Sequence, residues 1–173
     1  MCSSDLIAVA LAREGYDLAL TELDVAMLTD TLAHPDIAKR KVVPIALDLR
    51  SFESIAAAFG KARTGLGDID LLVNNAGRAL LKPVVDVTEL EWDDVIDTNL
   101  KGAFLLSQHF GRSCIQSKRP GAIVNMASTH GMTGIAGRSV YGISKGGLIQ
   151  MTRMLAIEWA EDRKSTRLNS SHT

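Results

Sequence analysis

Short apolar runs of β type alternate with longer runs of helical type along the whole chain. Strands are expected at residues 18–21, 42–47, 69–73 and 122–125, and helices at residues 7–14, 25–33, 52–62, 89–117 and 140–161. This order is typical of βαβ units, in which parallel strands are joined by helices that cover the sheet. The sequence therefore predicts an α/β fold with a doubly wound parallel sheet.

The composition is that of an ordinary globular domain, with 46% hydrophobic and 23% charged residues in a chain of 173. A net charge of −1 and the lack of a basic run argue against nucleic acid or an anionic membrane as partner. The apolar stretch 6–12 is too short to span a bilayer, so we expect a soluble protein. Only Cys2 and Cys114 are present, which excludes a disulfide framework or a thiolate metal site and favours a cytoplasmic location.

Both ends of the chain have a sequence unlike the rest. Residues 162–173 resemble a translated short-read sequencing adapter, and residues 1–6 fit the reverse complement of an adapter end. We therefore expect natural protein over residues 7–161 alone, a partial α/β domain, and we exclude both ends from the fold prediction. A genuine polar tail is the alternative interpretation of the C-terminal segment.

A tyrosine and a lysine lie one helical turn apart at the start of the last predicted helix. Tyr141 and Lys145 are four residues apart, so both side chains project from one helix face. A tyrosine ordinarily has a pKa of about 10, poorly matched to proton transfer at neutral pH, but a neighbouring ammonium favours the phenolate. Tyr141 could then act as a general acid or base. A solvated helix face is the alternative interpretation of this pair taken alone.

Ser128 precedes Tyr141 by 13 residues and follows the apolar strand 122–125. The carboxyl ends of parallel strands present ligand-binding groups, although a serine here could also simply cap a turn. Four motifs now stand in order: NNAG from Asn74, DTNLKG around Asn99, NMAS ending at Ser128 and YGISK from Tyr141. Together they resemble the classical short-chain dehydrogenase/reductase family, and the resemblance covers residues 7–161.

The resemblance implies an oxidoreductase that transfers a hydride between NAD(H) and a secondary alcohol or ketone. Tyr141 would protonate the carbonyl oxygen during reduction, and Lys145 would assist it and hydrogen-bond the nicotinamide ribose. Ser128 would polarise and position the substrate oxygen. Asn99 would hold a water molecule that links Lys145 to solvent, or would otherwise be a residue tolerated at a helix bend.

A second set of residues is expected to bind the adenosine part of the cofactor. By the same resemblance, Asn75, Ala76 and Gly77 line the adenosine ribose and support the sheet, with a plain turn as the alternative. Asp48 and Leu49 would meet the adenine edge. An N-cap role of Asp48 on the following helix is a compatible alternative.

Glu22 ends the strand LALTE, where an acidic residue can accept hydrogen bonds from the ribose hydroxyls. Its charge would repel a 2′-phosphate, so we expect NAD(H) rather than NADP(H). The neighbouring Asp24 is the alternative ligand, in which case Glu22 is a surface charge at a strand end.

The sequence departs from the family pattern at both ends. The family's first strand and its glycine-rich turn are missing, as are the last two strands and the substrate-covering segment. Without the first strand, the strands on either side of it would lose their hydrogen-bonding partner and the sheet would divide into two halves. Each backbone group left unpaired in the interior would lower stability by about 1 to 3 kcal/mol. We therefore expect the 173-residue chain itself to be poorly stable and catalytically inactive.

Two further questions stay open at this stage. The last helix is apolar over most of its circumference, which indicates either burial in its own core or a subunit interface of a homodimer or homotetramer. His130, Met132 and Arg138 either face the substrate or are ordinary loop residues. The alternative functions are a nicotinamide-dependent epimerase or dehydratase of the extended branch of the family, and a nicotinamide-binding protein without turnover.

Overall fold

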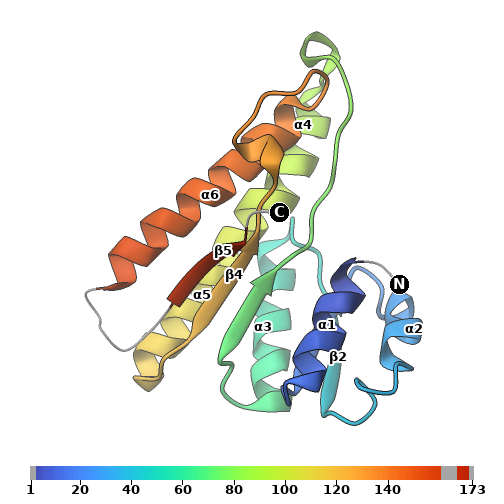
Figure 1. The fold of residues 1–173 in the computed structure, drawn as a ribbon, viewed down its shortest axis with the longest axis vertical. Coiled ribbons are helices and arrows are strands. Elements are labelled where there is room, and N and C mark those ends of the chain that lie inside the picture. The colour runs from blue at the N-terminus through green and yellow to red at the C-terminus, as the bar shows by residue number, and fades with distance from the viewer. Residues whose placement is uncertain (1–2, 161–166, 172–173) are drawn as a thin grey trace. The chain divides into compact units, whose positions relative to one another are not determined.

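The computed structural model describes residues 3–160 and 167–171, and the chain divides into two compact units, residues 1–69 and 70–173 (Figure 1). The elements of the first unit are α1 (Ser3–Arg13), β1 (Leu18–Glu22), a 3₁₀ turn (Val25–Leu28), α2 (Thr29–Leu32), β2 (Val42–Ala46) and α3 (Phe52–Leu66). Strands β1 and β2 pair in parallel, with Leu18 opposite Val42. The first unit is therefore a βαβ element, as the alternating pattern predicts.

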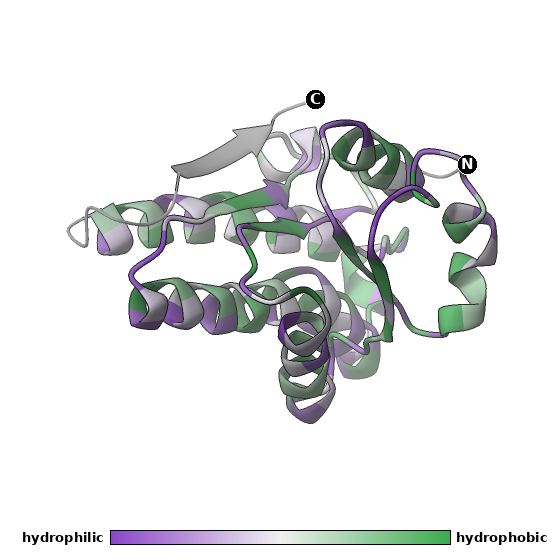
Figure 2. Cartoon of the chain, turned by 90° about the horizontal axis from the view of Figure 1, so that it is seen from below, coloured by the Kyte–Doolittle hydropathy of each residue, from purple (hydrophilic) through white to green (hydrophobic). Residues whose placement is uncertain are grey.

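The first unit has an apolar core between α1 and its two-stranded sheet. Its buried members are Ala8, Val9, Ala12, Leu18 and Ile37, with Leu11, Leu20 and Val42 packed against them. Because α1 presents Ala8 and Ala12 one turn apart on a single face, the helix packs closely on β1. Figure 2 shows the helices carrying both hydrophobic and hydrophilic residues, as expected for helices with one side in a core.

Helix α3 begins and ends with local signals. Its N-cap is Ser51, whose Oγ accepts a hydrogen bond from the Ser54 backbone N–H at 3.1 Å. The helix ends at Leu66, and the following C-cap residue is Gly67, whose φ of +85° favours glycine. The N-cap interpretation of Asp48 is thus wrong, because Asp48 lies three residues before the cap and its carboxylate binds Arg50 instead.

The second unit contains a three-stranded parallel sheet in the order β3-β4-β5. Its elements are β3 (Leu71–Asn74), a 3₁₀ turn (Val84–Asp86), α4 (Glu89–Ile96), a π-helical turn (Asp97–Lys101), α5 (Gly102–Ser117), β4 (Ala122–Met126), a 3₁₀ turn (Thr129–Gly131), α6 (Ser139–Ala160) and β5 (Arg167–Ser171). Asn74 is the register partner of Asn125, so their side chains point to the same face of the sheet.

Helices α5 and α6 cover that face of the second sheet. The apolar contact between them contains Ala103, Leu148, Met151 and Leu155, joined by Leu100 and Trp159. Trp159 reaches α5 at Gly111, where an added Cβ would come within 2.6 Å of the indole ring. The two helices therefore form one layer on the sheet, and that layer carries most of the candidate site.

The α/β fold with parallel strands is confirmed, with three local differences. The predicted helix 89–117 is interrupted by the π-helical turn, and the predicted helix 25–33 is a 3₁₀ turn followed by the short α2. A strand, β5, stands in the C-terminal segment that the sequence analysis leaves without an element. Main-chain pairing depends little on side chains, so an open edge of β4 can pair with a polar segment.

Within residues 3–160 and 167–171, the edge strand of each of the two sheets pairs with one neighbouring strand only. Among the described residues, β1 pairs with β2 alone and β3 pairs with β4 alone. The structure thus contains two separate ladders where the sequence analysis expects two half-sheets. No helix in the described part of the chain is both long and apolar enough for a membrane span.

Candidate active site

The turn that follows β4 packs directly on the first two turns of α6. An added Cβ on Gly142 would lie 2.9 Å from the His130 carbonyl oxygen, and one on Gly131 would lie 2.8 Å from the Lys145 carbonyl carbon. Real Cβ atoms do not approach backbone this closely, so only glycine fits at both positions. This contact brings Ser128 and His130 beside the residues at the start of α6.

Tyr141 and Lys145 lie on one side of α6, as their spacing predicts. The Lys145 Nζ is 5.8 Å from the centroid of the Tyr141 ring, and the rings of His130 and Tyr141 meet edge to face with centroids 5.7 Å apart. Ser128 Oγ lies 3.1 Å from His130 Nδ1. The structure therefore brings Ser128, Tyr141 and Lys145 into one cluster, with His130 between the serine and the tyrosine.

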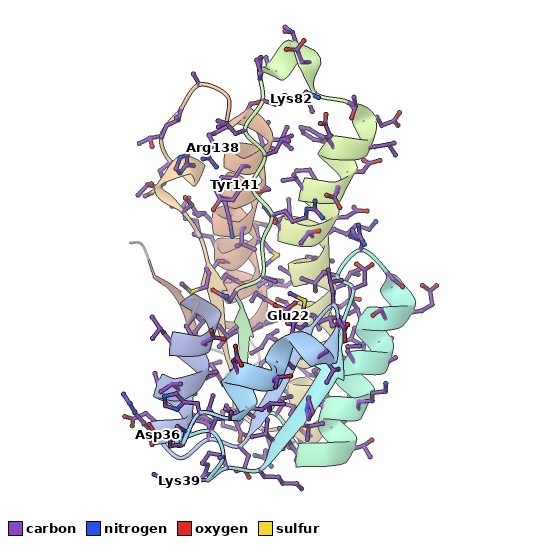
Figure 3. All side chains as sticks on the ribbon, turned by 90° about the vertical axis from the view of Figure 1, so that its right-hand side faces the viewer. Glu22, Asp36, Lys39, Lys82, Arg138 and Tyr141 are labelled. Carbon is purple, nitrogen blue, oxygen red and sulfur yellow. The ribbon has the colours of Figure 1, made fainter. Side chains whose placement is uncertain are left out.

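Tyr141 stands at the end of the unit that also carries Lys82 and Arg138 (Figure 3). The Lys82 backbone N–H donates to the Gly137 carbonyl oxygen at 2.8 Å, which ties the loop after β3 to the loop before α6. The apolar side chains of Leu81, Val84 and Ile135 line a cavity of about 620 Å³ between these two loops. This open, largely apolar groove adjoins the loops that lead to Tyr141.

Lys145 is buried, with 4% of its surface exposed. Its Nζ donates a hydrogen bond to the Met126 carbonyl oxygen at 2.7 Å, at the carboxyl end of β4. Burial lowers the pKa of the Lys145 ammonium from its ordinary value, because desolvation disfavours the charged form. A lysine held this way releases its proton more readily than a surface lysine, which suits a proton relay.

Asn99 lies in the π-helical turn and is 1% exposed. Its Oδ1 accepts from the Arg78 backbone N–H at 2.6 Å, and its Nδ2 donates to the Arg78 carbonyl oxygen and to Ser144 Oγ. The side chain therefore fastens the loop after β3 to α6. Single-turn π-helical insertions are common at functional sites, and Asn99 is the central residue of this one.

The segment Asn75–Gly77 follows β3 and reaches the surface. Ala76 and Gly77 are exposed, and Asn75 is half-buried. An added Cβ on Gly77 would lie 3.3 Å from Asn99 Oδ1 and 3.5 Å from Lys145 Nζ. The side chains of Asn99 and Lys145 therefore converge on a backbone position that carries no side chain of its own.

The remaining predicted cofactor residues lie in the first unit. Glu22 ends β1 (Figure 3), and its Oε2 accepts from the Leu23 backbone N–H at 3.0 Å. Asp24 is the N-cap of the 3₁₀ turn and accepts from the Ala26 backbone N–H. Both carboxylates thus accept a hydrogen bond from a nearby backbone N–H, and the hydrogen bonds alone do not choose between Glu22 and Asp24 as the ribose ligand.

Asp48 and Leu49 follow β2. The Arg50 guanidinium donates two hydrogen bonds to the Asp48 carboxylate, at 2.9 and 2.8 Å, and this lowers the pKa of Asp48 to about 2. The carboxylate is therefore ionised at neutral pH and partly occupied by its neighbour. Within the described residues no group of three His, Cys, Asp or Glu side chains is arranged to hold a metal ion.

Sequence reasoning did not identify two residues that support the cluster. Ser144 accepts from Asn99 Nδ2 and donates to the Tyr141 carbonyl oxygen at 2.7 Å. Asn125, on β4, links Asn74 of β3 to Thr152 of α6. Ser144 lies within the motif YGISK and Asn125 begins the motif NMAS, so membership of these motifs is the sequence signal that could have found them.

The family comparison agrees with these motifs. Residues 5–170 match the family model described as short chain dehydrogenase. The chain belongs to the short-chain dehydrogenase family. The match reaches residue 170, inside the segment that the sequence analysis attributes to an adapter.

Several relatives of known name are similar to this chain. The 2-dehydro-3-deoxy-D-gluconate 5-dehydrogenase of Escherichia coli K12 is 32% identical over 155 residues, which cover 90% of this chain and 60% of the relative. The 3-oxoacyl-[acyl-carrier-protein] reductase of Staphylococcus aureus Mu50 is 33% identical over 163 residues, which cover 89% and 63%. The chain thus spans about three fifths of the length of these relatives.

Solved structures of the family superpose closely on the chain. A candidate short-chain alcohol dehydrogenase from Sinorhizobium meliloti 1021 has a TM-score of 0.90 at 43% identity, covering 96% of this chain and 65% of that one. A metagenomic short-chain oxidoreductase in complex with NADP has a TM-score of 0.89 at 31% identity, covering 97% and 75%. These structures share the Rossmann-like α/β fold of the family.

Proposed function

We propose that the protein carrying this chain is a nicotinamide-dependent oxidoreductase that transfers a hydride between NAD(H) and a secondary alcohol or ketone. The observation that carries the proposal is the buried Lys145 ammonium, 5.8 Å from the centroid of the Tyr141 ring. Relatives named as dehydrogenases and reductases support the same reaction class. Because the chain spans about three fifths of those relatives, the activity belongs to the whole protein.

In this proposal, residues of α6 and of the turn after β4 carry out the proton transfer. Tyr141 gives its phenolic proton to the carbonyl oxygen during reduction and takes it back during oxidation. Lys145 stabilises the phenolate by its charge and, with a pKa lowered by burial, passes a proton onward. Ser128 donates a hydrogen bond to the substrate oxygen and holds it in place. A bound nicotinamide cofactor supplies or accepts the hydride.

Residues of each unit, taken separately, support the proposal of a nicotinamide cofactor. Gly77 is exposed and carries no side chain beside Lys145 Nζ, and in this proposal a ribose hydroxyl approaches the ammonium at that position. In the first unit, Glu22 ends β1 and can accept hydrogen bonds from the adenosine ribose. Asn75, Ala76, Asp48 and Leu49 are assigned to the adenosine part by the family resemblance.

We assign NAD(H) rather than NADP(H) from the carboxylate of Glu22, which would repel a 2′-phosphate. One structural neighbour is in complex with NADP, and a relative from Sus scrofa carries NADPH in its name, so the assignment requires a direct measurement. Comparing kcat/KM for NADH and NADPH in the intact protein provides it. Replacement Glu22→Ala should narrow the preference for NADH, whereas a higher kcat/KM with NADPH in the parent would refute the assignment.

The substrates named for relatives define the first compounds to assay. They are a keto sugar acid, as for 2-dehydro-3-deoxy-D-gluconate 5-dehydrogenase, and a 3-oxoacyl thioester, as for the acyl-carrier-protein reductase. Both contain a ketone or secondary alcohol next to a longer polar or apolar chain. An epimerase or dehydratase of the extended branch would show no net oxidation of NADH with either compound.

The experiment that tests the reaction class is Tyr141→Phe in the protein encoded by the intact reading frame. Loss of the phenolic proton should lower kcat about 10²- to 10⁴-fold, while NADH binding measured by fluorescence stays essentially unchanged. If this variant reduced the ketone at the parental rate, Tyr141 would not be the proton donor. An inactive parent that still binds NADH would favour the binding protein without turnover.

We also propose that the intact protein forms a homo-oligomer through α6. Val140, Leu148, Ile149, Met151 and Leu155 of this helix are buried, but Ile143, Met154 and Ile157 are exposed, Ile157 at 70%. A second copy of the chain would cover such an apolar face. Replacing Met154 and Ile157 by glutamate should reduce the mass measured by light scattering to that of the monomer. The cytoplasmic location stays a prediction from cysteine content.

A further inference from the structure

The Ser128 hydroxyl has two contacts with one residue, His130. Its Oγ accepts a hydrogen bond from the His130 backbone N–H at 3.2 Å and lies 3.1 Å from His130 Nδ1. Both residues are half-buried, so a ligand can still reach them. The imidazole ring also meets the Tyr141 ring edge to face, at an interplanar angle of 75°. His130 is therefore held on two sides, by the serine and by the tyrosine.

The proton on the imidazole ring decides what Ser128 can do. A serine hydroxyl has one proton to donate and two lone pairs, and one lone pair is already occupied by the His130 backbone N–H. If Nδ1 carries no proton, it accepts the hydroxyl proton of Ser128, and no proton is left for a substrate oxygen. If Nδ1 carries a proton, it fills the second lone pair, and the hydroxyl can only donate to another group.

A carbonyl oxygen accepts hydrogen bonds and donates none, so carbonyl reduction requires the second arrangement. The negative charge that develops on this oxygen is stabilised only by donors aimed at it. Ser128 with a free hydroxyl proton is such a donor, whereas Ser128 engaged by an unprotonated Nδ1 is not. The direction of one hydrogen bond on the turn after β4 thus determines whether Ser128 can assist the reaction.

We propose that His130 is a positioning residue that carries a proton on Nδ1 and thereby directs the Ser128 hydroxyl proton toward the substrate oxygen. The proposal rests on the function proposed above. His130 acts through Ser128 and needs no contact with the substrate. The contact of its ring with Tyr141 keeps the imidazole plane in the orientation in which Nδ1 faces Ser128.

Two replacements of His130 test the role of its aromatic ring and the role of its Nδ1 separately. His130→Phe keeps an aromatic ring against Tyr141 but removes Nδ1, and His130→Asn places an amide N–H near the position of Nδ1. In ketone reduction at saturating NADH we expect His130→Phe to lower kcat about tenfold, the effect of one hydrogen bond, with little change in KM. His130→Asn should recover most of this loss. Unchanged kcat in His130→Phe would overturn the proposal.

A double-mutant cycle with Ser128→Ala tests whether His130 acts through the serine. With Ser128 replaced, His130→Phe should change kcat by less than about twofold, because the hydroxyl that the histidine directs is gone. A tenfold loss that persists in the Ser128→Ala background would overturn the proposal, since His130 would then contact the substrate or support the fold. Tyr141→Phe serves as the reference, because parental activity in that variant refutes the proposed function instead.

The protonated nitrogen can also be observed without turnover. Nitrogen-15 NMR of the intact protein, labelled in its histidine rings and assigned through His130→Phe, distinguishes a protonated from an unprotonated Nδ1 by chemical shift. We expect the His130 Nδ1 signal in the protonated range. A signal in the unprotonated range would overturn the inference on His130 and would leave the proposed hydride transfer untouched.

Discussion

The second unit contains two polar clusters built from similar residues but placed at different depths. The interior cluster joins β3 and β4 to α5 and α6, and its members are Asn74, Ser107, Asn125 and Thr152, all buried. The candidate site cluster lies beyond the ends of the same strands and contains Ser128, His130, Tyr141 and Lys145. One cluster lies within the layer of helices on the sheet, and the other lies where that layer meets the loops.

The two clusters differ in how fully their hydrogen-bonding groups are used. In the interior cluster Asn74 Nδ2 donates to Ser107 and to Asn125 Oδ1, Asn125 Nδ2 donates to Thr152, and the Thr152 hydroxyl donates to the Leu148 carbonyl oxygen. Buried polar groups stabilise a fold when they are satisfied in this way. In the site cluster Lys145 is buried, but Ser128, His130 and Tyr141 are only half-buried. The interior cluster therefore serves the fold, whereas the site cluster keeps polar groups near the surface.

The largest expected effect is on activity, from Lys145→Met. Removal of the ammonium should lower kcat by at least about 10²-fold, whereas the free energy of unfolding should rise by about 1 kcal/mol, because a desolvated amine is replaced by an apolar chain. Steady-state kinetics and urea unfolding of the intact protein measure the two changes. The control is Lys101→Met, at an exposed lysine paired with Asp97, which should change stability by less than about 0.5 kcal/mol.

The same variant has a defined pH signature. Because burial lowers the pKa of Lys145, the unfolded chain binds more protons than the folded one between that lowered pKa and the ordinary value of about 10.4. The free energy of unfolding of the parent should therefore rise with pH through that range because of Lys145. The Lys145→Met variant should not show this increase. A steeper alkaline gain in the variant than in the parent would contradict the burial of a charged amine.

A smaller effect is expected where the site turn contacts α6. Gly142→Ala would bring a Cβ to 2.9 Å from the His130 carbonyl oxygen, so we expect a loss of about 1 to 3 kcal/mol in the free energy of unfolding. Gly60→Ala is the matched control, since Gly60 also lies within a helix but has nothing within 4 Å of an added Cβ. It should stabilise the protein by about 0.5 to 1 kcal/mol. Equal changes in the free energy of unfolding for the two variants would contradict the close contact between Gly142 and the His130 carbonyl oxygen.

The smallest effect is expected in the interior cluster. Thr152→Val removes the hydroxyl that accepts from Asn125 and keeps the volume, so we expect a loss of about 1 to 2 kcal/mol. Thr64 makes the same local hydrogen bond, from its hydroxyl to the carbonyl four residues earlier, but is exposed and has no buried amide partner. Urea unfolding should show a change below about 0.5 kcal/mol for Thr64→Val. Similar losses in both variants would show that the amide contact adds nothing.

Much of the fold could be predicted from periodicity. The strands at Leu18, Val42 and Ala122 and the last helix lie within one or two residues of their expected bounds, because apolar runs and turn residues define them locally. The interruption of the long helix at Asn99 was missed, since a π-helical turn leaves no periodic signal. The strand β5 was missed because its pairing is made by the backbone.

Only the part of the site that depends on residue spacing along the chain could be predicted from the sequence. The four-residue interval between Tyr141 and Lys145 puts both side chains on one helix face in any α-helix. The position of Ser128 and His130 against that face depends on Gly131 and Gly142, whose close contacts exist only after α6 has packed on the turn. The attribution of both chain ends to an adapter stays a prediction, which sequencing of the genomic locus checks.

By itself, the sequence determined the alternation of strands and helices, the family and the identity of the proposed proton-transferring pair, because these depend on residues close together along the chain. The tertiary structure alone decided which side chains are buried, that Lys145 donates to the Met126 carbonyl oxygen and that His130 stands between Ser128 and Tyr141. The reason is physical: burial and hydrogen-bond partners arise when segments distant in sequence pack together, and they change the charge and direction of groups that the sequence only names.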